Sequence, residues 1–318
     1  MYDKKSGLVT VFGGGGFIGR YVCECLFKSG VRVRVAERSP RRAYFLQPLA
    51  AVGQLDLLAA DLTRPESVAR AVDGARAVVN LVGILKGDFE ALQADGAAVV
   101  AREARAAGAG ALVHVSAIGA DPASESRYGA SKGEGEARVR AAFPNATVIR
   151  PSLVFGQEDQ LTNRFATLMS RLPAYPVIAP RTRFQPVFVR DLAKAIIAAT
   201  SEPGKHGGKT YEIAGPEVMT MRQLTEAIAG MAGLSPALID LPDFAAEALS
   251  YAGFLPGAPL TRDQWLMLQR DNVAASKSAG LEAFGISPTP LAAVAPEWLA
   301  RFREGGRFAA HRQSAPVS

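Results

Sequence analysis

The chain is poor in the residues that bind metals most tightly. It contains two cysteines, Cys23 and Cys25, and three histidines, His114, His206 and His311. The cysteines stand two apart in a predicted helix, so they point to different faces, and the histidines are far apart in the sequence. No metal site is therefore predicted. Two unpaired cysteines fit a reducing compartment, where they serve as small buried hydrophobic residues.

Other features are also missing. No run of 18 apolar residues occurs, which argues against a membrane-spanning helix. No compact basic stretch interleaved with aromatic residues occurs, so no nucleic-acid partner is expected. The first predicted strand begins at Leu8, which leaves no room for a signal or transit peptide, and we expect a cytoplasmic protein. The net charge of +6 comes mainly from scattered arginines and favours at most a weak attraction to anionic lipid or an acidic partner.

What the chain has is glycine in a particular place. Four consecutive glycines follow a short apolar run, Leu8–Phe12, and precede a helical stretch, Phe17–Ser29. Strand, glycine turn and helix in this order form a dinucleotide-binding turn, because the backbone can approach a pyrophosphate and helix amides point at its charge. An ordinary strand-to-helix turn is the plainer alternative. The expected cofactor contacts here are Gly13, Gly15, Gly16, Phe17, Ile18 and Gly19.

Strands and helices alternate through the first half of the chain. The predicted strands are Leu8–Phe12, Val31–Ala36, Leu55–Ala60, Ala77–Val82, Ala111–Ser116 and Thr147–Arg150. The predicted helices are Phe17–Ser29, Pro65–Val72, Phe89–Ala107 and Tyr128–Ala142. Near-continuous apolar strands between helices are typical of a parallel sheet covered on both faces. We therefore predict an α/β fold with a Rossmann-like, doubly wound parallel sheet and a smaller mixed C-terminal lobe.

The rhythm changes after Pro151. We assign residues 1–150 to the nucleotide-binding domain, 151–310 to the smaller lobe, from which the chain returns partly to the core, and 311–318 to a disordered tail. Further predicted elements are a strand at Pro186–Val189, a helix at Asp191–Thr200, a strand at Tyr211–Ala214, and helices at Thr220–Met231, Thr261–Arg270 and Leu291–Arg303.

The segment Leu234–Pro259 is unusually apolar for a surface lobe. Its large apolar side chains are Phe244, Leu249, Tyr251, Phe254 and Leu255. Such residues either pack on a protein partner or the membrane surface, or fill the core of the lobe itself. The sequence leaves both open.

Three residues near the fifth predicted strand could carry acid–base chemistry. Ser116 ends that strand, and Tyr128 and Lys132 stand four apart at the start of the next helix, so they share one face. A nearby lysine charge is expected to lower the tyrosine pKa from about 10 and make Tyr128 a usable proton donor or acceptor. Ser116 could hydrogen-bond a substrate oxygen. The alternative is an ordinary surface helix start, because this spacing is common by chance.

The cofactor is expected to be selected at the end of the second strand. Glu37 there favours the ribose hydroxyl of NAD, whereas Arg38, Arg41 and Arg42 favour the 2′-phosphate of NADP, which arginine binds with paired donors. We favour NADP(H), with NAD(H) as the alternative. Solvated arginines without a ligand are the plainer interpretation.

Together with Asp61-Leu62 and Arg150-Pro151-Ser152, these motifs resemble the extended or atypical short-chain dehydrogenases/reductases over roughly residues 8–230. The resemblance implies a nicotinamide cofactor across the strand ends, with Asp61 at the adenine and Pro151 near the nicotinamide. It implies cofactor contacts from Asp61, Leu62, Val82, Gly83, Ser116, Tyr128, Lys132 and Pro151, in addition to the glycine turn, Arg38 and Arg41.

A narrower resemblance covers most of the chain. It is carried by Gly16–Val22, Phe155–Asp159, Asn163–Ala166, Gln185–Val189, Thr261–Asp263 and Pro288–Leu291. These segments resemble the NADPH-binding accessory subunits of respiratory complex I and their bacterial relatives. The resemblance implies a nucleotide-holding subunit on the peripheral arm of NADH:quinone oxidoreductase, with little or no turnover, in the cytoplasm or on the inner face of the cytoplasmic membrane.

Two other functions stay open. The chain could be an active NAD(P)-dependent reductase, epimerase or dehydratase that uses Ser116, Tyr128 and Lys132. It could also bind the dinucleotide as a redox sensor and report its oxidation state to a partner.

Overall fold

The computed structural model describes residues 7–253 and 260–303. The predicted disordered tail and the apolar residues Phe254 and Leu255 lie outside these ranges. The chain forms two compact units, and each draws on several segments. The first unit contains Met1–Pro151, Val189–Ile213 and Ala274–Ser287, and the second contains Ser152–Phe188, Ala214–Val273 and Pro288–Ser318.

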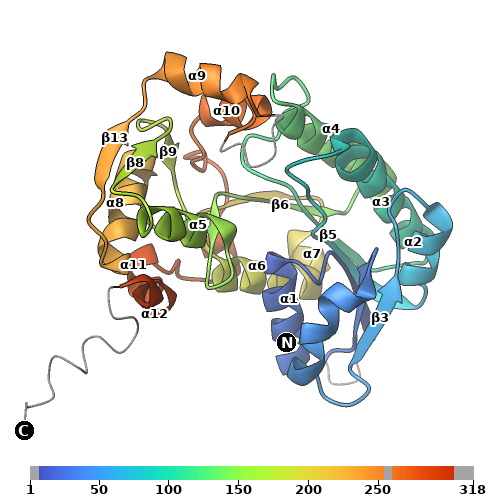
Figure 1. Cartoon of the computed structure of the whole chain (residues 1–318). Coiled ribbons are helices and arrows are strands. Elements are labelled where there is room, and N and C mark those ends of the chain that lie inside the picture. The colour runs from blue at the N-terminus through green and yellow to red at the C-terminus, as the bar shows by residue number, and fades with distance from the viewer. Residues whose placement is uncertain (1–6, 254–259, 304–318) are drawn as a thin grey trace, which may run out of the picture. The chain divides into compact units, whose positions relative to one another are not determined.

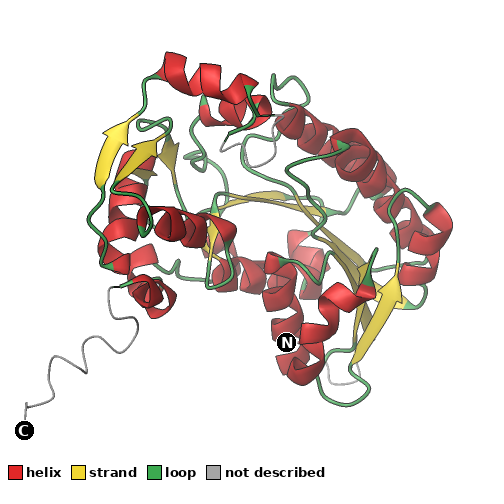
Figure 2. Ribbon diagram, viewed as in Figure 1, coloured by secondary structure: helices red, strands yellow, loops and turns green. Residues whose placement is uncertain are grey.

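A seven-stranded sheet forms the centre of the first unit. Its strand order is β11-β6-β5-β4-β1-β2-β3, and all neighbouring strands are parallel. The strands are β1 (Leu8–Phe12), β2 (Val33–Glu37), β3 (Leu55–Ala59), β4 (Ala75–Asn80), β5 (Ala111–Val115), β6 (Thr147–Pro151) and β11 (Thr210–Ile213). The prediction of a Rossmann-like, doubly wound sheet is confirmed, and Figure 2 shows its strands between layers of helices.

Helices cover both faces of this sheet. They are α1 (Phe17–Lys28), α2 (Pro65–Val72), α3 (Gly96–Ala106), α4 (Arg127–Ala142), α6 (Val189–Ser201) and α7 (Pro203–His206), with short turns η1 (Pro40–Leu49), η2 (Glu90–Asp95) and η3 (Leu281–Phe284). Helices α2, α3 and α4 pack on one face, and α1 and α6 pack together on the other (Figure 1). Because the strands are parallel, their carboxyl ends share one edge, where polar residues from several loops can meet.

Apolar packing explains why the helices lie where they do. Val78, Leu112 and Val148 along the sheet are fully or almost fully buried, and Val100 and Val139 from α3 and α4 are buried as well. The same face also carries buried polar groups near the carboxyl edge, among them Asn80, His114 and Lys132. Buried polar groups are costly unless they are paired, so this end of the sheet is suited to a specific site.

One predicted helix is interrupted. Instead of a single helix over Phe89–Ala107, the chain forms a π-helical turn, η2, followed by α3. Helix α4 passes close to this turn, because Gly135 leaves no room for a Cβ beside the carbonyl oxygen of Gln93. The sequence does not show this contact between helices.

The second unit is smaller and mixed. Its strands are β7 (Val154–Phe155), β8 (Ala174–Val177), β9 (Arg183–Phe184), β10 (Val187–Phe188), β12 (Met219–Thr220) and β13 (Ala237–Asp240). Its helices are α5 (Gln160–Met169), α8 (Met221–Ala232), α9 (Asp243–Tyr251), α10 (Arg262–Leu268), α11 (Leu291–Val294) and α12 (Pro296–Leu299), with a final turn η4 (Ala300–Phe302). Phe155, Leu224, Ile228, Trp298 and Leu299 are among the residues of its core.

Several elements of this unit differ from the sequence prediction, which gave no β7, β8, β9, β12, β13 or α9. Helix α5 was not predicted, although Asp159 caps it by accepting a hydrogen bond from the Thr162 amide. The predicted helix Leu291–Arg303 is three short helical turns, because Pro296 begins a new one.

The apolar segment before residue 254 is partly exposed. Helix α9 buries Ala246 and Ser250, whereas Phe244 is 77% exposed and Tyr251 is 62% exposed. The guanidinium of Arg262 lies over the Tyr251 ring, 4.8 Å from its centroid. Among the described residues, no helix combines the length and hydrophobicity that a bilayer crossing requires.

Candidate functional site

The glycine turn between β1 and α1 needs glycine for its own geometry. Gly13 has a φ of +79°, a conformation that side chains disfavour. The Gly16 amide donates a hydrogen bond to the Gly13 carbonyl oxygen at 3.0 Å. A Cβ on Gly19 would lie 2.4 Å from that same oxygen. Gly13 and Gly19 therefore allow the chain to fold back tightly against the start of α1.

Gly16 is different, because it leaves open space. It is exposed at the N-cap of α1, where no side chain caps the helix and the first turn holds no acidic residue. Among the described residues, and apart from its chain neighbours and the backbone of α1, the only atom within 4 Å of a Cβ added there is the Gly13 carbonyl oxygen, at 3.2 Å. The free N-terminal end of α1, with its positive dipole, thus faces open space, an arrangement that fits a pyrophosphate.

The acidic residue at the end of β2 already has a partner. A carboxylate oxygen of Glu37 accepts a hydrogen bond from the Gly15 amide at 2.8 Å. The neighbouring Arg38 and the η1 residue Arg41 are exposed. The Glu37 carboxylate, which would bind the ribose hydroxyl of NAD, is therefore hydrogen-bonded to the glycine turn. The guanidinium groups of Arg38 and Arg41 face solvent.

Asp61 lies just beyond β3. Its carboxylate accepts hydrogen bonds from the Thr63 amide at 3.0 Å and the Thr63 hydroxyl at 2.8 Å. These hydrogen bonds are the main reason that the Asp61 pKa lies below its usual value, and the positive charges of Arg38 and Arg64 lower it further by a smaller amount. Asp61 therefore carries its negative charge beside Arg38 at the carboxyl edge.

The next residue, Leu62, has a different place. Its side chain is buried in the hydrophobic core between the sheet and helices α2 and α3. It packs so closely on Gly96 that a Cβ added to Gly96 would lie 2.8 Å from the Leu62 Cβ. The Leu62 side chain is therefore part of the core, and Leu62 is 5% exposed.

The loop after β4 joins the glycine turn to Lys132. A Cβ on Gly13 would lie 3.4 Å from the Val82 nitrogen, and one on Gly83 would lie 3.2 Å from Lys132 Nζ. Lys132 Nζ donates to the carbonyl oxygens of Val115 at 3.2 Å and Val82 at 3.5 Å. The structure thus brings Gly13, Val82, Gly83 and Lys132 into one continuous set of contacts.

Ser116 has an unsatisfied hydroxyl. It follows β5 and its amide donates to the Ile149 carbonyl at 2.7 Å, while Ile118 donates to the Pro151 carbonyl at 3.0 Å. Ser116 is only 4% exposed, and its Oγ has no hydrogen-bond partner among the described residues. A buried hydroxyl without a partner is costly. A ligand oxygen at this position would satisfy it.

The predicted lowering of the Tyr128 pKa is wrong. Burial raises the pKa of Tyr128 to about 12, and burial lowers the pKa of Lys132 to about 8. The Lys132 ammonium donates to main-chain carbonyls, and the Tyr128 ring packs edge-to-face on Phe89 with centroids 6.2 Å apart. Without a bound nucleotide, Tyr128 is therefore a neutral phenol at pH 7.

Sequence reasoning missed two residues that support this arrangement. The side-chain Oδ1 of Asn80 accepts a hydrogen bond from the Val82 amide at 3.1 Å. Gln93, in the π-helical turn, donates to the Ser131 hydroxyl at 3.0 Å and accepts from the Ile84 amide at 3.2 Å. Together they hold the loop after β4 against α4. The sequence offered one signal for these two residues: Asn80 and Gln93 are polar residues among apolar neighbours.

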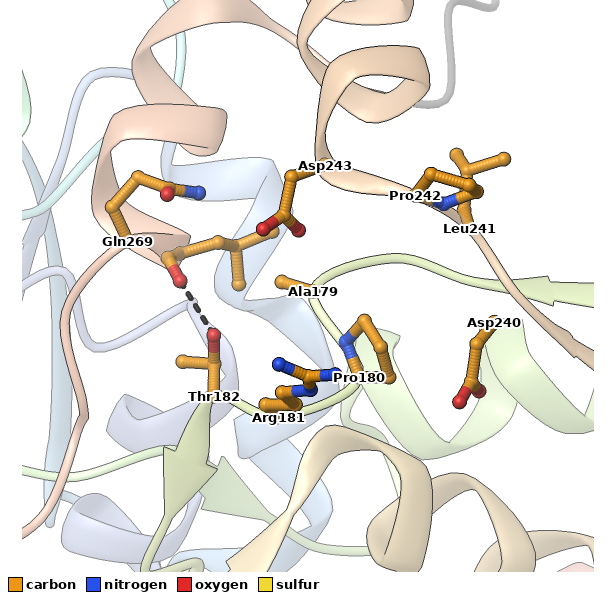
Figure 3. Close-up of a pocket in the computed structure, with 10 residues that line it drawn as sticks. Ala179, Pro180, Arg181, Thr182, Asp240, Leu241, Pro242, Asp243 and Gln269 are labelled. Carbon is orange, nitrogen blue, oxygen red and sulfur yellow. Dashed lines mark hydrogen bonds between the residues drawn. The ribbon is translucent and has the colours of Figure 1, made fainter.

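A separate hollow of about 390 Å³ lies in the second unit. The side chains of Arg181, Asp243 and Gln269 border it, and Thr182 Oγ1 donates to the Leu268 carbonyl at 2.7 Å (Figure 3). None of the predicted site residues borders this hollow. Among the described residues, no cluster of histidine, cysteine and carboxylate side chains could hold a metal ion.

Comparisons with known proteins agree with this geometry. The model of the NAD dependent epimerase/dehydratase family matches residues 9–214. The chain is 34% identical over 311 residues to the mitochondrial NADH dehydrogenase (ubiquinone) 1 alpha subcomplex subunit 9 of Mus musculus, covering 95% of this chain and 82% of that protein. It is 32% identical over 247 residues to a ceramide reductase of Caulobacter vibrioides, covering 76% of each chain.

A solved structure has the same fold. An NADPH-dependent quinone oxidoreductase from Escherichia coli, complexed with NADPH, superposes with a TM-score of 0.74 over 92% of this chain and 99% of that chain, at 22% identity. The fold is thus an NAD(P)-binding fold, and the family match spans the glycine turn, the strand ends and the Ser116–Tyr128–Lys132 set. The chain belongs to the NAD dependent epimerase/dehydratase family, the extended short-chain dehydrogenases/reductases, and has complex I subunits among its homologues.

Proposed function

We propose that the chain holds NADP(H) as an accessory subunit of a membrane-bound NADH:quinone oxidoreductase, with little or no turnover. The observation that carries this proposal is the extent of the match to the mouse complex I subunit, which runs over 95% of the chain and so includes the second unit. The chain would then lie on the peripheral arm, on the inner face of the cytoplasmic membrane.

The nucleotide would bind along the carboxyl edge of the sheet. The first turn of α1 and the open face of Gly16 would receive the pyrophosphate, Asp61 the adenine end, and Val82, Gly83 and Pro151 the nicotinamide half. Arg38 and Arg41 would pair with the 2′-phosphate, because Glu37 is already bonded to the Gly15 amide. The exposed guanidinium groups of Arg38 and Arg41 and the bonded carboxylate of Glu37 therefore favour NADP(H) over NAD(H).

The state of the acid–base set supports a holding role. In the chain without nucleotide, burial raises the Tyr128 pKa to about 12, far from the neutral range in which an acid–base group exchanges protons most readily. Lys132 is bonded to two main-chain carbonyls. In this proposal Ser116, Tyr128 and Lys132 are contacts of the bound nucleotide.

The test is native electrophoresis of gently solubilised membranes from the source cell, with detection of this chain and of NADH:quinone oxidoreductase activity. We expect the two to migrate together, and the nucleotide released from the purified complex to include NADPH. Migration of the chain alone at its own mass would contradict the proposal.

A second candidate is an active NADPH-dependent reductase. The observation that favours it is the Caulobacter ceramide reductase at 32% identity, together with the presence of Ser116, Tyr128 and Lys132. Ser116 would bind the substrate carbonyl, Tyr128 would supply the proton, and Lys132 would tune it. A screen of long-chain keto lipids would show NADPH oxidation that Tyr128→Phe abolishes without loss of NADPH binding; a screen without oxidation of NADPH counts against this candidate.

A further inference from the structure

The hollow of the second unit is bordered by two charged side chains that have no partner within the described part of the chain. Arg181 comes from the turn between β8 and β9, and Asp243 begins α9 (Figure 3). Neither the Arg181 guanidinium nor the Asp243 carboxylate forms an ion pair or a hydrogen bond with a described residue. Asp240, which also borders the hollow, is paired with Arg222 at 2.8 Å. One positive and one negative charge therefore remain available beside a space of about 390 Å³.

The turn that carries Arg181 is held firmly in place. Ala179 has a φ of +51°, the one positive φ outside glycine in the described part of the chain. The Thr182 amide donates to the Ala179 carbonyl oxygen at 3.1 Å, and the Arg222 amide donates to the Pro180 carbonyl oxygen at 3.1 Å. A strained backbone persists only where its surroundings hold it, and such positions are frequent at ligand sites. The structure thus presents Arg181 on a preformed turn.

The chemistry of the border indicates a ligand that carries charges of both signs. A guanidinium binds phosphate through charge-assisted hydrogen bonds, whereas a carboxylate binds an ammonium group. The Gln269 side chain adds an amide that can accept a hydrogen bond from an ammonium or donate one to a phosphate. Proteins bind quaternary ammonium groups in cages of aromatic rings, and none of the described residues that border the hollow is aromatic. A primary ammonium is therefore a better fit than choline.

Helix α9 also presents an exposed aromatic face. Phe244, the second residue of the helix, is 77% exposed, and Tyr251, two helical turns further on, is 62% exposed. This spacing places both on one face, and the acid between them, Glu247, is paired with Arg262 at 2.8 Å. Ile239 of β13, the strand before α9, is 56% exposed. Aromatic and aliphatic side chains of this kind enter the interfacial region of a bilayer.

We propose that this part of the second unit binds a phosphatidylethanolamine headgroup at a membrane surface. The phosphate lies against Arg181, the primary ammonium against Asp243 and Gln269, and Phe244 enters the boundary between headgroups and acyl chains. The charges of Arg181 and Asp243 cancel, which fits a lipid without net charge and gives an anionic lipid little advantage. This contact is a property of the chain itself and does not depend on assembly with other subunits.

The experiment measures binding of the full chain to lipid vesicles by flotation. The vesicles contain phosphatidylcholine alone, or phosphatidylcholine mixed equally with phosphatidylethanolamine or with phosphatidylglycerol. We expect phosphatidylethanolamine to raise the partition coefficient by about tenfold or more, and phosphatidylglycerol to raise it less. Arg181→Gln and Asp243→Asn should each abolish the preference for phosphatidylethanolamine, and Phe244→Ser should weaken binding to every vesicle.

Matched controls in the same unit are Arg171→Gln and Val218→Ser, at exposed positions that do not border the hollow. Both should bind vesicles as the unmodified protein does, and thermal unfolding shows whether each variant is folded. Equal binding to vesicles with and without phosphatidylethanolamine, or a preference that survives both Arg181→Gln and Asp243→Asn, overturns the proposal.

Other occupants of this surface give different results. Titration with O-phosphoethanolamine tests for a soluble ligand. Binding of this compound that requires Arg181 and Asp243, without any preference among the vesicles, would assign the hollow to a free metabolite and overturn the lipid proposal. Absence of binding to every vesicle and to O-phosphoethanolamine would leave this face to a protein partner and overturn it as well.

Discussion

Lys132 Nζ lies 3.2 Å from the carbonyl oxygen of Val115, and this bond ties helix α4 to the end of strand β5. The lysine is almost fully buried, and burial lowers its pKa to about 8. The folded chain therefore holds a proton on Lys132 less tightly than the unfolded chain does, whose lysines titrate near 10.5.

This difference predicts a pH dependence of stability. Below pH 8 the buried ammonium is a cost to the fold, and between pH 8 and about 10.5 the cost is relieved, because the unfolded state binds the extra proton. Relative to Lys132→Met, the unmodified protein should gain up to about 3 kcal/mol over that range. Urea unfolding of both proteins at about pH 7.5 and about pH 10 measures it. Parallel pH profiles would show that Lys132 keeps an ordinary pKa.

A substitution at Gly16 should affect nucleotide binding but not folding. Its φ of −85° suits any residue, and the nearest contact of an added Cβ within the described part of the chain, beyond its sequence neighbours, is the Gly13 carbonyl oxygen at 3.2 Å. Gly16→Ala should keep the thermal unfolding midpoint within a few degrees and weaken NADPH binding by about tenfold or more, because the methyl group occupies the pyrophosphate space.

The matched control is Gly230→Ala in helix α8, where a Cβ meets nothing within 4 Å. It should stabilise the fold by up to about 1 kcal/mol and leave NADPH affinity unchanged. Isothermal titration with NADPH compares the two variants. Full affinity in Gly16→Ala would mean that the pyrophosphate lies elsewhere.

Arg38 should decide between the two cofactors. It is exposed, and its charge contributes to the lowered pKa of Asp61. Because a guanidinium forms charge-assisted hydrogen bonds to a phosphate, Arg38→Ala should weaken NADPH binding by about tenfold or more and change NADH binding little. The control Arg171→Ala removes an equal charge from the second unit. Equal losses for NADPH and NADH would place Arg38 away from the 2′-phosphate.

Local sequence signals were enough for most of the first unit. The apolar runs of β1 and β3 and the proline that begins α2 define those elements to within a residue. The start of β2 and the end of β4 differ from the prediction by two residues, because apolar residues continue beyond the paired region. The glycine turn was predictable because its geometry depends on residues that are close to one another in the sequence.

Contacts between distant segments were not predictable. Gly135 of α4 closely approaches the Gln93 carbonyl in the π-helical turn, and the raised pKa of Tyr128 depends on burial. The side chain of Leu62 packs into the core against Gly96, which the local sequence does not reveal. In each case the deciding neighbour lies more than 30 residues away, on another element.

Asn80 and His114 supply a further prediction. Asn80 Oδ1 accepts from the Val82 amide, so its Nδ2 faces His114 Nδ1, at 3.3 Å. His114 then accepts this hydrogen bond as a neutral imidazole, with its remaining proton on Nε2, which has no partner among the described residues. Burial, followed by the charges of Lys132 and Arg140, lowers the His114 pKa from 6.5 to about 3.

The neutral His114 should make the protein sensitive to acid. Between pH 6.5 and about 3 the unfolded chain binds a proton at this residue and the folded chain does not, so stability falls as the pH falls, by up to about 1.4 kcal/mol per pH unit. His114→Gln keeps a polar partner for Asn80 but cannot titrate, and its stability should fall less steeply. Urea unfolding of both proteins at about pH 7 and about pH 5 gives the difference, in which the carboxylates common to both largely cancel. An equal loss in the two proteins would mean that His114 is protonated in the folded state, and the hydrogen bond from Asn80 would then have to be broken.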